Sequence, residues 1–226
     1  MRDETTESDA SLAHRLSQTC NAHGFSASVR PIVHRLAYVN ESLSEGRYFF
    51  LDIKREGRVL YKKSWVELEE PRELSAEGQR RIAQEYFDSW LKAAHGFYEG
   101  FEFYKGRDNL PLAAFNLNQS AESAYKCILL VHTFYTPQEH RLVYLALEAA
   151  AFGPVYEEIF PCQTQEEQDL FDLLDNAYIA GRYRMGFSVD HEHLDYLAER
   201  VQRLLAVTEQ ICQAEIERLA QDAAKQ

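Results

Sequence analysis

The sequence of 226 residues has little of what marks several protein classes. It holds only 10 Gly and 6 Pro, while 46% of its residues are hydrophobic, which excludes a collagen-like or disordered chain. Its longest uncharged apolar run, near Cys127 to Val131, is far shorter than the roughly 20 residues that cross a bilayer. No basic region followed by an apolar one opens the chain, so no secretory signal is evident. We expect a cytoplasmic protein without a membrane segment.

Paired cysteines and an excess of positive charge are also missing. The four cysteines, at positions 20, 127, 162 and 212, form no C-x-x-C pair, which favours reduced structural thiols over zinc or redox chemistry. Among the eight histidines, no pair at i and i+4 has a third carboxylate in register, so we expect no metal site. The net charge of -12 argues against a general nucleic-acid binder, although a local basic cleft stays open.

The first third of the chain has a mixed α and β pattern. We expect a disordered arm over residues 1–10 and a helix from Ser11 to about 23. A strand over 25–34 and a helix over 36–43 that ends at Gly46 follow. The run 48–53 gives the strongest strand signal, and 58–61 gives a second, short one. Residues 11–72 are therefore predicted to form a small α/β segment.

Beyond position 74 the pattern is helical. Aromatic residues at steps of three and four between Tyr86 and Tyr104 predict a long helix, and this spacing favours core packing over a base-stacking platform. Further helices are predicted over 112–135, 136–151 and 165–184, and a last one is capped by Asp190. Five helices with short connections predict an up-and-down bundle over 73–222. The predicted fold class is α+β, mainly α.

Several positions of this bundle match a known pattern in order. They are Ala113-Ala-Phe-x-Leu-x-Gln-x-Ala-Glu122-x-x-x-Lys126, Leu129-Leu130, Pro137-x-x-His140-x-Leu142 and Asp175-x-Ala-Tyr178-x-x-x-Arg182-Tyr183. The pattern resembles the HEPN family, the helical domain named for nucleotide binding in higher eukaryotes and prokaryotes, over roughly residues 75–220. The resemblance implies association with a nucleotide or RNA, a homodimer formed through the bundle, and a prokaryotic toxin–antitoxin or defence type system.

Residues 31–74 are similar to the C-terminal half of the minimal nucleotidyltransferase domain that often precedes HEPN. That family holds phosphates and two metal ions with a Gly-Ser turn and an Asp-x-Asp pair, and both motifs are missing here. Asp52 would be the one surviving carboxylate. The resemblance thus implies a truncated, inactive remnant with no cofactor. Magnesium is expected only if a complete transferase exists upstream or in a partner chain, for which this protein would be a structural partner.

The candidate binding site starts from Glu122 and Lys126. Their i, i+4 spacing fits a plain helix salt bridge, but flanking small and apolar residues leave open that both point into a groove between helices. The resemblance adds Arg182 as the main phosphate ligand, with Tyr183 and His140 beside it. If both charged groups are buried and the pair has a third partner, the position in a groove between helices is favoured over the surface salt bridge.

Arg184 and His191 give a second candidate, a metal-independent endoribonuclease. HEPN ribonucleases resemble one another in an Arg followed four to six residues later by a His, where the Arg stabilises a phosphate and the His acts as acid and base. Here six residues separate the two. The polar residue that usually follows the Arg is replaced by Met185, and the resemblance places Arg182 at the matching position. Whether the protein is an enzyme therefore stays open.

Overall fold

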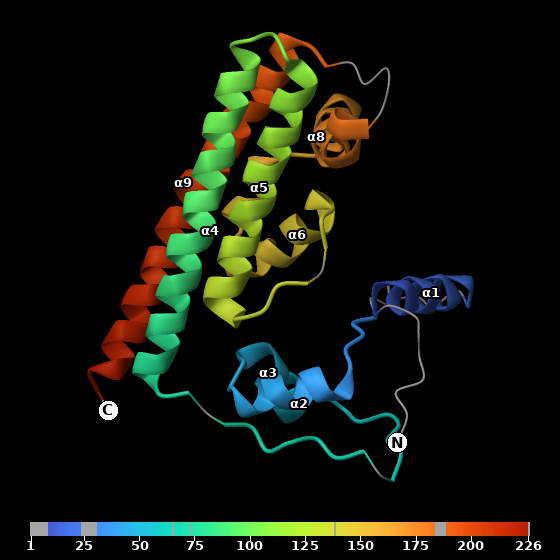
Figure 1. Cartoon of the computed structure of the whole chain (residues 1–226), viewed down its shortest axis with the longest axis vertical. Coiled ribbons are helices and arrows are strands. Elements are labelled where there is room, and N and C mark those ends of the chain that lie inside the picture. The colour runs from blue at the N-terminus through green and yellow to red at the C-terminus, as the bar shows by residue number, and fades with distance from the viewer. Residues whose placement is uncertain are drawn as a thin grey trace. The chain divides into compact units, whose positions relative to one another are not determined.

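The computed structural model describes residues 9–23, 31–64, 66–72, 74–137, 139–183 and 189–225, and these contain helices but no strand (Figure 1). The chain divides into two compact units, Met1–Glu73 and Leu74–Gln226. Each unit is described by itself below.

The first unit contains three helices, α1 (Asp9–Ala22), α2 (Leu36–Ser44) and α3 (Tyr48–Glu56). The helices predicted over 11–23 and 36–43 are thereby confirmed. Gly46 ends α2 in the left-handed region, with φ of 74°. The N–H of Gly46 donates to the carbonyl of Leu43 and the N–H of Arg47 to that of Ser42. This pairing of the last carbonyls is the C-terminal motif that favours glycine.

The strands predicted over 48–53 and 58–61 are not present. The run 48–53 lies in α3, where Phe50 and Leu51 are buried and the Phe50 ring meets the edge of Tyr38. A short apolar run fits a buried strand or one face of a helix equally well, and here packing against α2 decides. Residues 58–61 and 31–35 have no regular structure, and 24–30 lie outside the described residues. The small α/β piece is therefore not supported.

The second unit is the predicted helical bundle. Its elements are α4 (Ala76–Lys105), α5 (Leu110–Thr133), α6 (Leu142–Ala149), the 3-10 turn η1 (Ala150–Phe152), α7 (Val155–Ile159), α8 (Gln165–Tyr183) and α9 (His191–Ala223). Side chains cap three of them: Ser75 accepts from the N–H of Gly78, Asn109 from that of Leu112, and Asp190 from that of His193. The cap predicted at Asp190 is thereby confirmed.

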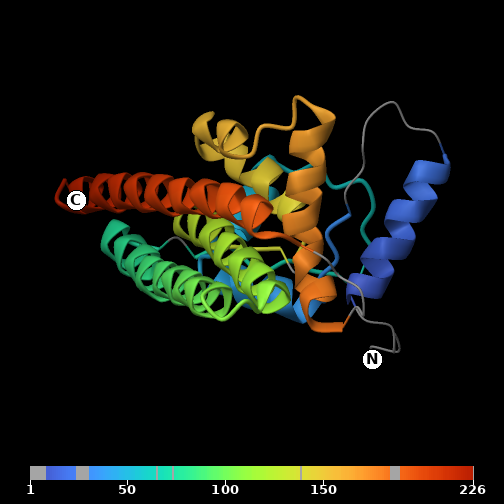
Figure 2. The same ribbon diagram turned by 90° about the horizontal axis from the view of Figure 1, so that it is seen from above.

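The long helices α4, α5 and α9 lie side by side, and α8 crosses them (Figures 1 and 2). The helix α4 runs antiparallel to α5. By contrast, α9 runs parallel to α5, since Asp108 before α5 meets His191 at the start of α9, and Cys127 farther along α5 meets Cys212. The bundle is confirmed, but the up-and-down order applies to α4 and α5 rather than to all five helices. The short elements α6, η1 and α7 connect the end of α5 to the start of α8.

The central helix α5 is enclosed by its neighbours. Every residue from Leu117 to Val131 except Gln119 is buried, because α4, α6, α8 and α9 all pack on it. A helix buried on all sides is apolar all round, apart from polar groups that are paired. Its buried polar side chains therefore mark the places to look for a site.

Candidate functional site

A buried ion pair lies in the middle of α5. Glu122 is 6% exposed and Lys126 is 8% exposed, and Nζ of Lys126 lies 2.6 Å from Oε1 of Glu122. The charge of Lys126 also lies 5.8 Å from the ring centre of Trp90 on α4. Buried charges are stable only when paired and fully hydrogen-bonded. The expectation of a plain surface salt bridge does not describe this pair.

Glu122 has two further donors. Nε2 of Gln119 donates to Oε2 over 2.8 Å, and Nδ1 of His140 lies 2.9 Å from Oε1. Because an ionised carboxylate only accepts hydrogen bonds, Nδ1 of His140 carries the proton. Three donors on one carboxylate satisfy a charge that water cannot reach. The pair thus has the third partner that a groove position requires.

His140 connects this buried carboxylate with the surface. Its side chain is 54% exposed, while that of Glu122 is 8% exposed. Its ring stacks on Tyr178 of α8, with centres 5.2 Å apart and planes 5° apart. Within the described part of the chain, Nε2 of His140 has no hydrogen-bond partner. The ring therefore presents one fixed nitrogen inward and leaves the other for solvent or a ligand.

Asp175 of α8 fixes the segment that carries His140. It is 2% exposed, and its carboxylate accepts from Nε of Arg141 and from the N–H of Leu142, both over 2.5 Å. The hydrogen bond to Asp175 raises the pKa of the Arg141 guanidinium. Because Leu142 is the first residue of α6, Asp175 caps this helix from a distant part of the chain. This explains why the helix predicted from 136 begins at 142.

Two amides extend the network and were missed in the sequence. Nδ2 of Asn118, a fully buried residue, donates to the carbonyl of Leu174 over 2.9 Å, and Nε2 of Gln119 lies 3.0 Å from Oδ1 of Asn118. The roles of Asp175 and Arg141 were missed as well. The available signal was a group of polar residues inside the most apolar helix, but the partner of Asn118 on α8 is 56 positions away. We call the group Asn118, Gln119, Glu122, Lys126, His140, Arg141, Asp175 and Tyr178 the polar cluster.

Arg182 and Tyr183 belong to the last turn of α8, one turn after Tyr178. The structure describes their place on the helix and not their side chains. At 1.5 Å per residue, the backbone of Arg182 lies about 6 Å along the helix from the Tyr178 that stacks on His140. Arg184 lies outside the described residues. The structure thus brings together Glu122, Lys126 and His140 and places the Arg182 position near them.

His191 lies elsewhere, at the first residue of α9. Its Nε2 is 2.9 Å from Oδ1 of Asp108, and both side chains are exposed. Because Asp108 precedes α5 and Glu122 is twelve residues beyond Leu110, His191 lies about 18 Å from Glu122 along that helix. The two candidate sites are therefore separate.

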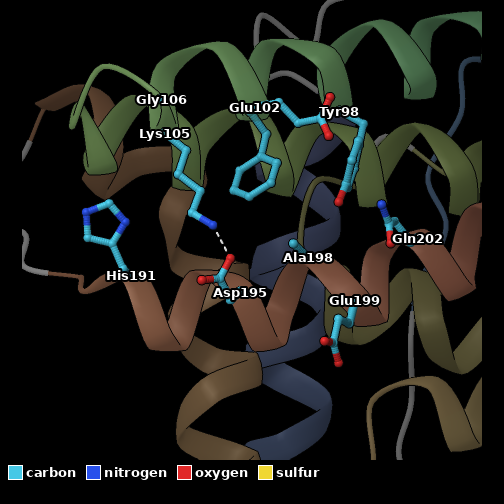
Figure 3. Close-up of a pocket in the computed structure, with 10 residues that line it drawn as sticks. Tyr98, Glu102, Lys105, Gly106, His191, Asp195, Ala198, Glu199 and Gln202 are labelled. Atoms are coloured by element: carbon cyan, nitrogen blue, oxygen red, sulfur yellow. Dashed lines mark hydrogen bonds and ion pairs between the residues drawn. The ribbon is translucent and has the colours of Figure 1, made fainter.

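A groove of about 540 Å³ runs between the end of α4 and the start of α9, with His191 at one end (Figure 3). Three carboxylates line it, those of Glu102, Asp195 and Glu199. Burial and these three negative charges raise the pKa of Tyr98 to about 12. The one lysine, Lys105, pairs with Asp195. The groove beside His191 is therefore acidic and disfavours a phosphate chain.

The other features considered in the sequence add little to the site. Asp52 is exposed on α3 in the first unit. Among the described residues, no three His, Cys, Asp or Glu side chains gather as metal ligands would. None of the helices in those residues is long and apolar enough to cross a membrane.

Residues 87–219 match the model of the HEPN domain. The chain belongs to the HEPN domain family. The match covers more than half of the sequence and includes all of the polar cluster and His191. At the level of the family, this makes the chain a nucleotide- or RNA-related module. No protein with a curated description matches the sequence significantly.

Proposed function

We propose that this HEPN protein binds a nucleotide at the exposed edge of the polar cluster, where His140 and Tyr178 meet the last turn of α8. The observation that carries the proposal is the bridge from the buried Glu122–Lys126 pair through His140 to the surface. Orienting an exposed imidazole with a buried, triply bonded carboxylate is a costly arrangement for a structural role alone. Such support is typical of a binding site held in one geometry.

The charges of the cluster assign separate roles to its cations. Lys126 is paired with Glu122, and Arg141 with Asp175, so these two pairs are close to neutral. Binding of a phosphate needs further positive charge. We assign the binding of the phosphate to Arg182, since a guanidinium can bind phosphate through two hydrogen bonds. Nε2 of His140 supplies a further contact. Glu122 and Lys126 then act through His140 as positioning residues, and we assign Tyr183 to the same nucleotide site.

A ligand panel tests the proposal. ATP, GTP, AMP and uridine monophosphate are each added to the full chain with a chelator present, and the thermal unfolding midpoint is followed. A nucleotide that binds only the folded protein at 100 times its Kd adds about 2.7 kcal/mol to the unfolding free energy, so the midpoint rises. No shift with any nucleotide at millimolar concentration would refute the proposal.

A specific contact supports the second candidate, the endoribonuclease. Asp108 holds His191 through Nε2, as a carboxylate orients an acid–base histidine, and the ring stays exposed. The acidic groove beside it argues the other way. Cleavage of RNA without divalent metal that disappears in both Arg184→Ala and His191→Ala would establish this activity. Cleavage that survives either change would exclude it.

The setting that we propose follows the family. It is a prokaryotic toxin–antitoxin or defence type system in which the protein forms a dimer through its bundle, with a separate nucleotidyltransferase chain as one candidate partner. Light scattering gives the oligomeric state directly.

A further inference from the structure

Positive charge is concentrated in one short stretch of this acidic protein. Residues 54–63, Lys-Arg-Glu-Gly-Arg-Val-Leu-Tyr-Lys-Lys, hold five of the 24 basic residues and one acidic residue, hence a local charge of +4 in a chain of -12. We call these residues the basic segment. It precedes the part of the chain that matches the HEPN model.

Two cations of the basic segment are open to a partner. Lys54, by contrast, pairs with Glu70 of the same unit. Arg58 and Lys62 of the basic segment are exposed and have no partner in the described part of the chain. Their charge is therefore available to an anionic partner.

The apolar residues of the segment are exposed as well. Val59, Leu60 and Tyr61 are 69%, 90% and 79% exposed. The chain after α3 has no regular structure as far as Lys63. In the part of the chain that the structure describes, none of the residues 58–62 makes a hydrogen bond. Exposing three consecutive large apolar side chains is unfavourable in water and marks an interaction surface.

The chain that follows the basic segment is anchored within the first unit. Asn40 of α2 bonds to the carbonyl of Glu67 and to the N–H of Glu69, and Lys54 of α3 bonds to the carbonyl of Glu69. The N–H of Arg72 donates to the carbonyl of Leu43. Residues 66–72 are thus held on α2 and α3 of the first unit.

We infer that the basic segment binds single-stranded RNA. Arg58 and Lys62 neutralise phosphates, and the exposed ring of Tyr61 stacks on a base, which any sequence permits. Successive side chains of an extended chain point to opposite sides, so phosphate and base contacts can alternate along it. A second copy is a poor occupant, because antiparallel pairing about Leu60 would place Arg58 opposite Lys62. The inference is independent of the proposed nucleotide site.

Fluorescence anisotropy tests this inference with a labelled single-stranded RNA of mixed sequence and the full chain. Reversing two charges in R58E/K62E should weaken binding at least ten-fold. It should also reduce the slope of the logarithm of the binding constant against the logarithm of the salt concentration by about 1.4. Tyr61→Ala should weaken binding about five-fold or more. The control R81E/K92E changes the net charge equally on the exposed face of α4 and should bind as the natural protein does.

Three outcomes would overturn the inference: no binding at low salt, equal loss in the control, or binding to phosphatidylserine vesicles but not RNA. The vesicle result would assign the basic segment to an anionic membrane surface. Thermal unfolding checks that the variants fold. Because R58E/K62E leaves the polar cluster untouched, nucleotide binding should persist in it, so the failure of this inference and that of the proposed function can be told apart.

Discussion

Nδ1 of His140 lies 2.9 Å from Oε1 of Glu122, the same oxygen that lies 2.6 Å from Nζ of Lys126. One buried oxygen thus holds both a buried cation and a half-exposed ring. Removing either partner changes the hydrogen bonding of the other two. The polar cluster is therefore expected to respond to substitution as a unit.

Replacing Lys126 by Met should destabilise the fold by about 3 kcal/mol or more, because it leaves the buried Glu122 without its counter-charge. The double variant E122Q/K126M removes both charges and should cost less than the two single changes together. Urea unfolding measures each value. The matched control, Lys92→Met on the exposed face of α4, should change stability by less than about 0.5 kcal/mol. A cost below about 1 kcal/mol for Lys126→Met would show that the pair is solvated.

Asp175→Ala should loosen the start of α6, because Leu142 loses its cap and Arg141 its partner. We expect a loss of about 2–3 kcal/mol, and a smaller one for Asp175→Asn, which keeps one acceptor. Hydrogen exchange across residues 139–149 should accelerate in both variants. Exposed Asp172, one turn earlier on α8, serves as the control. Unchanged exchange in Asp175→Ala would contradict the assigned cap.

The stability of the bundle should fall as the pH drops through the ordinary range of histidine. Burial lowers the pKa of His132, an effect aided by Arg218 and opposed by Glu215. Its buried Nε2 has no hydrogen-bond partner among the residues that the structure describes. Because the folded state binds the proton less readily than the unfolded state does, stability is full above pH 6.5 and is lost below it. His132→Phe keeps a ring against Phe152 and should flatten this dependence. An equally steep loss in the variant would assign the effect to another group.

The three thiols of the bundle should separate by reactivity. Cys162 is exposed, whereas Cys127 and Cys212 are buried with their sulfurs 4.0 Å apart. The hydrogen bond with Cys127 and burial both raise the pKa of Cys212, which suppresses the reactive thiolate. Brief treatment with iodoacetamide followed by mass spectrometry should label Cys162 and spare the buried pair until urea is added. Early labelling of Cys212 would contradict the packing of α5 on α9.

The sequence predicted the helices of the bundle better than anything else. Long periodic runs with a capping residue, such as the helix after Asp190, leave little choice of structure. The run 48–53 misled because strand propensity depends on having a neighbouring strand, and α2 offers a helix surface instead. Glu122 and Lys126 could be singled out from one helix. Asp175 and Asn118 acquire their roles only when α8 packs on α5, a contact that no local pattern encodes.

Calorimetric titration of a nucleotide into the protein, two variants and a control variant tests the proposed nucleotide site. We predict that His140→Ala and Arg182→Ala weaken binding at least ten-fold while both variants stay folded, since each removes a contact to phosphate. The control Arg200→Ala, which removes a cation beside Tyr196 on α9, should bind as the natural protein does. Undiminished binding in both His140→Ala and Arg182→Ala would show that the nucleotide does not bind at this site.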